Sequence, residues 1–162
     1  MRPLSRSLPF LLPILAAAVA PAALATSYVP VADADLAAKA EAIAVVRVIE
    51  RLAPSPAGEE PSTRYRAAVE EAVSGRLDGE IVVRVPGGTS ADGTGWDVAA
   101  APRFGDGERA LLFLVERGDG SWGIADLMLG AFHEVVRDGE RLAVRDLADA
   151  TRVGGASAAG SE

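Results

Sequence analysis

The chain of 162 residues is 49% hydrophobic and carries a net charge of −7, with 23 acidic residues against 16 basic ones. This length suits one compact domain and is too short for two full ones. Nucleic acids and anionic membranes bind clustered Lys and Arg, so the acidic balance argues against both as partners. The absence of cysteine excludes disulfides, thiolate metal sites and a cysteine nucleophile.

The first residues have the pattern of a cleavable secretion signal. Arg2 and Arg6 precede an apolar run from Leu8 to Ala20, and the small-residue motif Ala23-Leu24-Ala25 predicts cleavage after Ala25. A membrane anchor is disfavoured, because the run of about 13 residues is shorter than the ~20 needed to span a bilayer.

This pattern predicts a signal peptide over 1–25, one barrel-like domain over 26–152 and a disordered tail of small and polar residues over 153–162. Cleavage would leave 14 basic residues against 23 acidic ones, a net charge of about −9. We expect the product to be secreted or periplasmic, with no stable membrane span once the signal is removed.

The first half of the expected domain starts with a helix and continues with strands. Asp33–Ala40 is rich in helix formers, with Asp33 as the expected N-cap. The β-branched run Ile43–Ile49 predicts a strand buried on both faces, and the proline-rich stretch 54–62 predicts a loop. Thr63–Val73 alternates as a strand does, although its Ala and Glu content leaves a helix open.

Further strands are expected at Ile81–Val85, weakly at Asp97–Ala100, and at Ala110–Val115. Between the first two lies a glycine-rich loop, 89–96.

Two hairpins are expected after that. Gly118-Asp119-Gly120 turns the chain into a strand over Trp122–Leu129, and Asp138-Gly139 joins Phe132–Arg137 to Arg141–Arg145. These segments predict a mainly β fold, a small antiparallel OB-like barrel or sandwich of 5–7 strands with one short N-terminal helix.

Several motifs in order resemble a family of uncharacterised secreted bacterial proteins. The pieces are Val82-Val-Arg-Val-Pro-Gly-Gly88, Ala101-Pro-Arg-Phe104, Gly107-Glu-Arg-Ala-Leu-Leu-Phe-Leu114 and Leu127-Met-Leu-Gly-Ala-Phe-His133. The likeness runs from Tyr28 to about Arg152 and implies no activity.

The layout of signal, opening helix, first strand, long loop and second strand is also distantly similar to the netrin-like module of tissue inhibitors of metalloproteinases. That similarity implies a five-stranded OB-type barrel. In those inhibitors an N-terminal cysteine chelates the protease zinc. The expected mature chain instead starts at Thr26 and has no cysteine, so only the α-amine and hydroxyl of Thr26 could approach a metal.

His133 is the only histidine, so a two-histidine zinc site within one chain is excluded, and a serine-histidine relay would depend on this residue alone. A structural role is favoured for it, because no G-x-S-x-G motif accompanies it. For Trp96 and Trp122 we favour core packing over lining an exposed groove with Phe104. Arg117-Gly118-Asp119 spells an integrin-binding tripeptide, but hairpin geometry explains it better.

The leading hypothesis is a non-catalytic accessory module that contacts another exported protein, with an exported metalloprotease among the candidates. The contact would use the helix end and the Gly88–Trp96 loop, and no cofactor or metal is expected. The alternatives are a hydrolase-type enzyme using His133 with Asp126 or Glu134, and a structural envelope protein. The residues assigned to the binding surface are Thr26, Ser27, Tyr28, Gly87, Gly88, Trp96 and Phe104.

Overall fold

The computed structural model describes residues 26–148 and 150–152. The signal peptide, its cleavage after Ala25 and the tail from residue 153, all expected from the sequence, lie outside the described residues.

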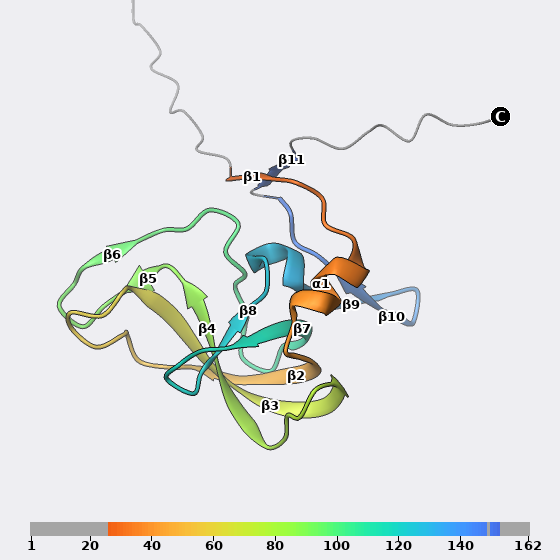
Figure 1. Ribbon diagram of the computed structural model, residues 1–162, viewed down its shortest axis with the longest axis horizontal. Coiled ribbons are helices and arrows are strands. Elements are labelled where there is room, and N and C mark those ends of the chain that lie inside the picture. The colour runs from red at the N-terminus through yellow and green to blue at the C-terminus, as the bar shows by residue number, and fades with distance from the viewer. Residues whose placement is uncertain (1–25, 149, 153–162) are drawn as a thin grey trace, which may run out of the picture.

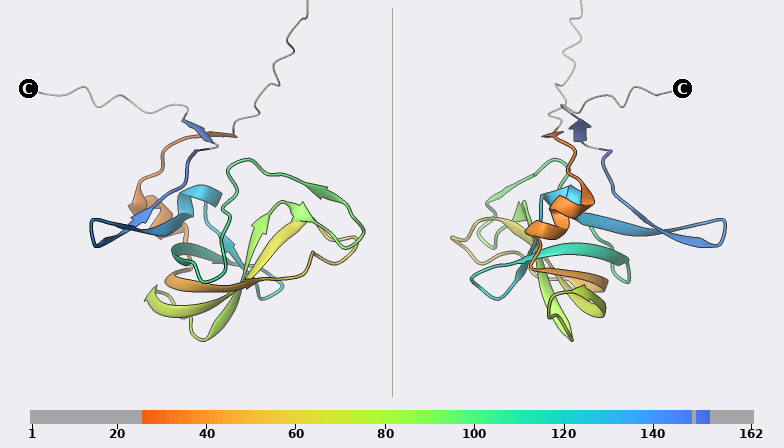
Figure 2. Two further views of the ribbon diagram at one scale, coloured as in Figure 1. Left: turned by 180° about the vertical axis from the view of Figure 1, so that it is seen from behind. Right: turned by 45° about the vertical axis from the view of Figure 1, so that its right-hand side comes forward.

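Five strands close into a small barrel, as Figures 1 and 2 show. Around the barrel, β7 lies beside β2, which is followed by β3, β4 and β8, and β8 returns to β7. All these pairings are antiparallel except that of β4 with β8, which is parallel at Val83 and Trp122. The prediction of a mainly β, OB-like barrel with one short helix is confirmed, and its sheet is mixed. The barrel strands are β2 (Ala42–Arg51), β3 (Ser62–Ser74), β4 (Glu80–Pro86), β7 (Arg109–Glu116) and β8 (Trp122–Ile124).

The other elements extend the barrel or connect its strands. Strands β9 and β10 continue the sheet beyond β7, β5 and β6 form a small hairpin, and β1 pairs in parallel with β11. Their bounds are β1 (Thr26–Tyr28), α1 (Asp33–Lys39), β5 (Gly88–Thr89), β6 (Gly95–Trp96), the 3-10 helix η1 (Leu127–Gly130), β9 (Ala131–Arg137), β10 (Glu140–Val144) and β11 (Ala150–Arg152).

Alternation along the strands produces the barrel core. Every second residue of β2 from Ala42 to Val48 is buried, and β4 buries every second residue from Ile81 to Val85. Leu112 and Leu114 of β7 meet them inside the barrel at 1% exposure or less. This period of two is what places one face of each strand on a common core.

A second apolar layer covers the outside of β7. Leu36 of α1 is fully buried there, together with Phe113 and with Met128 and Leu129 of η1. Ile43 lies on the face of β2 that points away from the barrel core, and it packs against this layer. The predicted burial on both faces therefore holds for one face only, because on the other face the apolar side chains are half-buried and Arg47 is exposed.

Three local predictions are corrected by the structure. Ala32, not Asp33, is the N-cap of α1, and the carboxylate of Asp33 instead bonds Arg145 at 2.5 Å. Asp97–Ala100 forms no strand. The strand expected over Trp122–Leu129 ends at Ile124, because Asp126 and Leu127 adopt positive φ angles of 48° and 56° and turn the chain into η1.

Within the described residues, no helix is long and apolar enough to cross a lipid bilayer.

Candidate binding groove

A groove of about 630 Å³ opens where the β5–β6 hairpin faces the segment from Asp97 to Phe104. The start of β3 and the end of β4 form its floor, so the groove lies at one end of the barrel. Its lining combines glycines, prolines, aromatic rings and charged side chains. The residues that carry the argument below are Arg51, Tyr65, Gly87, Gly88, Trp96 and Phe104.

The hairpin that forms one wall is tied to the loop between β2 and β3. Ser55 is fully buried and forms a bridge with Ser90, and the Ala91 N–H donates to the Ser55 carbonyl at 2.8 Å. The Ser90 hydroxyl donates to the Glu59 carbonyl at 3.2 Å. Because these groups are buried and satisfied, the predicted glycine-rich loop has a defined conformation at its base.

Glycine is required at the two positions where the hairpin leaves the barrel. Gly87 and Gly88 have φ angles of 88° and 123°, in the region that disfavours residues with a Cβ. A Cβ on Gly88 would also lie 2.7 Å from the Thr63 hydroxyl oxygen. That hydroxyl donates to the Gly87 carbonyl at 3.0 Å, so the glycines let the hairpin approach β3 closely.

The aromatic residues of the groove fall into two kinds. Phe104 and Tyr65 are 8% and 3% exposed, with their rings edge to face at a centroid distance of 5.3 Å. The Phe104 N–H donates to the Tyr65 hydroxyl at 3.4 Å, and this bond holds Phe104 against strand β3 of the barrel. Trp96 is 46% exposed and lines the groove from the hairpin side. The preference for core packing is therefore wrong for Trp96. It is right for Trp122, which packs against the barrel core.

The charges in the groove differ in their pairing. Arg103 donates to Asp97 at 2.7 Å, and both side chains are well exposed. Arg51, at the end of β2, has no ion-pair partner among the residues described here. The lining of the groove thus includes both a guanidinium with no described ion-pair partner and an exposed indole.

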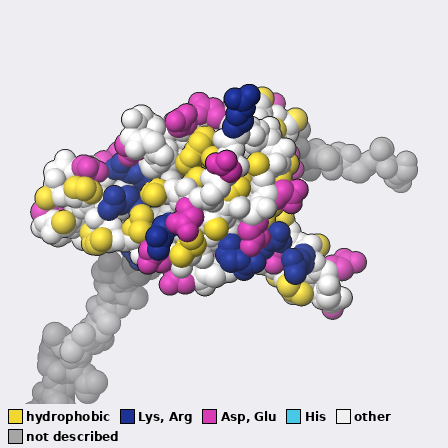
Figure 3. Space-filling view, turned by 90° about the horizontal axis from the view of Figure 1, so that it is seen from below, with side chains coloured by type: hydrophobic (Ala, Val, Ile, Leu, Met, Phe, Trp, Pro, Cys, Tyr) yellow, Lys and Arg dark blue, Asp and Glu magenta, His cyan; other side chains and the backbone are white. Residues whose placement is uncertain are grey.

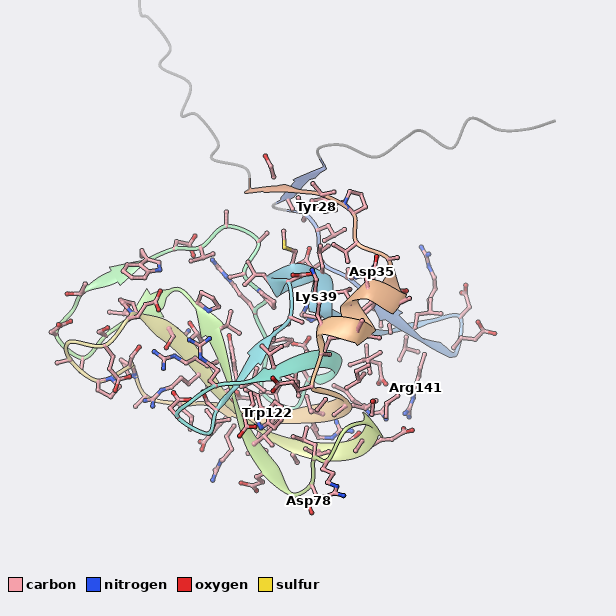
Figure 4. All side chains as sticks on the ribbon, viewed as in Figure 1. Tyr28, Asp35, Lys39, Asp78, Trp122 and Arg141 are labelled. Atoms are coloured by element: carbon pink, nitrogen blue, oxygen red, sulfur yellow. The ribbon has the colours of Figure 1, made fainter. Side chains whose placement is uncertain are left out.

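The residues assigned to the binding surface from the sequence lie in two separate parts of the structure. Gly87, Gly88, Trp96 and Phe104 all line the groove. Tyr28 instead packs against the apolar layer outside β7, and Thr26 and Ser27 pair with β11. Figure 4 shows Tyr28 above α1, and Figures 1 and 2 place α1 and the β5–β6 hairpin on different sides of the barrel. The helix end and the loop therefore do not form one surface.

Sequence reasoning missed Arg51 and Tyr65 as groove residues. The alternation of β3 does point Tyr65 inward, but no local signal shows that it would meet Phe104, 39 residues later. Arg51 reads as an ordinary surface charge at a strand end.

His133 has a carboxylate partner that sequence reasoning did not identify. Its Nδ1 bonds Glu108, and its ring stacks on Phe104 at a centroid distance of 5.2 Å. The two proposed partners are engaged elsewhere, Asp126 with Lys39 at 2.6 Å and Glu134 with Arg109. The cavity of about 90 Å³ beside His133 has no serine or threonine among its described lining residues. This geometry favours a structural histidine.

The tripeptide at the β7–β8 turn is also held by internal bonds. Asp119 accepts from the Ser121 hydroxyl at 2.6 Å and from Arg84 at 3.0 Å. Arg84 further donates to the Ser62 hydroxyl at 2.8 Å and to the Glu60 carbonyl at 3.2 Å. Arg84 therefore joins this turn to the β2–β3 loop, and the Asp119 carboxylate is not free for an outside partner.

Bonds from Ser121, and then from Arg84, lower the pKa of Asp119 from 3.8 to about 2. A depressed folded-state pKa means that the ionised side chain stabilises the fold above about pH 4, and that this contribution disappears as the pH falls toward 2. We expect Asp119→Asn to lower the melting temperature near neutral pH, and we expect the difference from wild type to close by about pH 2.

Thermal unfolding across this range, followed by circular dichroism, measures the effect. Asp78→Asn, in the exposed β3–β4 turn labelled in Figure 4, is the matched control and should leave the profile unchanged. A difference between Asp119→Asn and wild type that stays constant down to about pH 2 would contradict the assignment.

Among the residues with described positions, no group of three or more His, Asp or Glu side chains is placed to hold a metal ion. The carboxylate of Asp92, in the Asp-Gly-Thr-Gly stretch of the β5–β6 hairpin, accepts the Thr94 N–H at 2.9 Å. This bond is the leading reason that the pKa of Asp92 is lowered.

The described residues thus form a small OB-like barrel with a groove at one end. Comparisons with protein-family models, with curated proteins and with solved structures found no match.

Proposed function

We propose that this protein is an exported, non-catalytic binding module whose groove receives an extended segment of another exported protein. The N-terminal signal pattern supports export, to the periplasm or the medium. The observation that carries the proposal is Trp96, an indole that remains 46% exposed on the wall of a groove, while each of the other described aromatic side chains packs against the barrel core or the apolar layer outside β7. Tryptophans in such positions commonly supply a large share of binding energy.

The chemistry of the groove favours a segment that carries a carboxylate. Arg51 has no ion-pair partner among the described residues, and a guanidinium forms its strongest bonds with carboxylates. The prolines and glycines of the lining present backbone and flat apolar surface, which suit a chain in extended conformation. An acidic segment that places an apolar side chain on Trp96 and a carboxylate on Arg51 would satisfy both features.

The charge distribution on the barrel supports a protein partner over a nucleic acid. Arg47 and Arg109 both bond Glu70, and Arg66 bonds Glu50 at 2.6 Å. Figure 3 shows basic and acidic side chains intermingled on the face seen from below. Arginines that are neutralised in this way release few counterions on meeting a phosphate backbone.

We expect Trp96→Ala to reduce capture of the partner at least roughly tenfold, because it removes the main apolar anchor of the groove. The measurement uses the tagged full chain, recovered outside the cytoplasm, with its bound proteins identified from culture supernatant and periplasm. Arg51→Glu should weaken capture of the same partner by charge reversal.

Val73→Ala provides the matched control, since Val73 is an exposed apolar residue of β3 outside the groove. Capture that survives Trp96→Ala at wild-type level would reject the groove as the site. A structural envelope role predicts this same result, because it needs no discrete site, so the comparison also separates the two hypotheses. Retention of the signal at the N-terminus of the recovered chain would contradict cleavage after Ala25, and failure to recover the chain outside the cytoplasm would overturn the export prediction.

A further inference from the structure

The sheet that forms the barrel has one free edge. Because β7 and β8 close the barrel, the sheet order ends at β10 and no other described strand pairs with its outer side. Strands β9 and β10 form a hairpin that projects from the barrel, as the right-hand view of Figure 2 shows. An open strand edge with apolar side chains is a ready template for another strand.

Exposed apolar side chains concentrate on this hairpin. Seven large hydrophobic residues are exposed in the described part of the chain, and four of them lie on β9 and β10. Leu142 lies directly opposite Val135, and the alternation along β10 puts Val144 on the same face. A monomer gains nothing from this arrangement, since these three side chains remain 39% to 44% exposed.

We propose that the partner of this edge is a second copy of the chain, with the two β10 strands paired antiparallel about a two-fold axis through Leu142. The occupant follows from the charges and the register of β10 itself, and the proposal is independent of the groove and its ligand.

The backbone of β10 suits this pairing. The two-residue turn Asp138-Gly139 makes Arg137 and Glu140 a hydrogen-bonded pair of the hairpin, so the N–H and C=O groups of Arg141 and Ala143 point outward. In a pairing centred on Leu142, Arg141 of one copy faces Ala143 of the other. The backbone N–H and C=O groups of each Arg141 then form two hydrogen bonds with those of Ala143 in the other copy. Leu142 faces Leu142 of the second copy as a close, non-hydrogen-bonded pair.

Charge and strand length together favour this register. A pairing centred on Val144 would oppose no like charges either, but all of it except the central pair would use residues beyond the end of β10. Shifting the axis to Arg141 would place the two Arg141 side chains directly opposite each other, which is destabilising. Shifting it to Ala143 would oppose Arg141 to Arg145 and Glu140 to Asp146, two like-charge pairs at each end. Among the residues of β10 itself, the register centred on Leu142 opposes no like charges.

In this register, each face of the β9–β10 hairpin meets a matching face of the second copy across the two-fold axis. On one face Val135 and Leu142 would meet Leu142 and Val135 of the second copy, which gives an unbroken apolar row over four strands. On the other face Arg141, labelled on the projecting hairpin in Figure 4, would reach across the small Ala143 of the second copy toward Glu134, which lies beside that alanine. One carboxylate oxygen of Glu134 already bonds Arg109, so Arg141 would approach the other oxygen. The contact is thus apolar on one face and charge-complementary on the other.

Cysteine substitution tests the register directly, because the chain has no native cysteine. Under mild oxidation, Leu142→Cys should form a covalent dimer at least roughly tenfold faster than Val73→Cys, since non-hydrogen-bonded cross-strand pairs bring Cβ atoms within disulfide range. Equal rates for the two variants would overturn the proposal.

Sedimentation of the full chain provides the second measurement. A strand pairing of five residues lies at the small end of specific interfaces, so we expect a reversible dimer at concentrations on the order of 100 μM. Leu142→Arg, which places two like charges on the axis, should leave only monomer, whereas Val73→Arg should not. A wild-type chain that stays monomeric at this concentration, or a dimer unaffected by Leu142→Arg, would refute the pairing.

Discussion

Leu114→Ala should lower the free energy of unfolding by about 3 kcal/mol, within the range of 2 to 5 observed for buried leucines. Leu114 is fully buried and lies on β7 between Ala42 of β2 and Ile124 of β8. It therefore packs at the point where the barrel closes. Its neighbours cannot collapse into the space without opening the β7–β8 pairing, so the loss should include both a transfer and a cavity contribution.

Denaturant unfolding of the wild type and the variant measures this difference. Val73→Ala removes apolar atoms from an exposed site on β3 and should change stability by less than roughly 0.5 kcal/mol. A loss below about 1 kcal/mol for Leu114→Ala would mean that β7 does not contribute to a closed core.

Gly130→Ala should also be strongly destabilising, with an expected loss of more than roughly 2 kcal/mol. A Cβ at this position would lie 2.2 Å from the carbonyl oxygen of Ala125. That oxygen cannot move freely, because the Ala125 N–H donates to Phe113 at 2.8 Å and the next two residues already have positive φ angles. The clash falls on backbone atoms, so side-chain rotation cannot relieve it.

Gly118→Ala is the matched control for this substitution. Nothing lies within 4 Å of a Cβ at Gly118, and its φ angle is not in the left-handed region. We expect an effect between neutral and about 1 kcal/mol of stabilisation, through the lower entropy of the unfolded chain. If melting temperatures show Gly130→Ala to be as mild as Gly118→Ala, the turn into η1 is packed less tightly than described.

Much of the fold could be predicted from local patterns. The alternation of Thr63–Val73 outweighed its Ala and Glu content, and the segment forms β3. Asp138-Gly139 adopts the two positive φ angles of 53° and 83° that a tight hairpin turn needs. In both cases the deciding signal lies within a few residues.

The features that escaped prediction depend on residues far apart in the sequence. The end of β8 at Ile124 follows from the Asp126–Leu127 turn, and its parallel bridge to Val83 of β4 has no local signature. The weak strand predicted over Asp97–Ala100 does not form, and Asp97 and Val98 line the groove instead.

In the candidate site, too, the residues close together in sequence could be predicted and the contacts between distant segments could not. Gly87, Gly88 and Trp96 could be assigned together because they flank one loop, and Phe104 because an isolated aromatic in a polar connection tends to anchor it. Thr26–Tyr28 was assigned by resemblance to inhibitors with a reactive N-terminus. In the structure this segment pairs with β11, a contact between the two ends of the chain that no local pattern reveals.

The most direct test of the groove as the binding site is an amide chemical-shift map of the isotope-labelled protein with and without its captured partner. The largest changes should fall on Arg51, Gly87, Gly88 and Trp96, with α1 and β1 unaffected. Changes centred on α1 and β1, with the groove amides unmoved, would contradict the assignment of the groove.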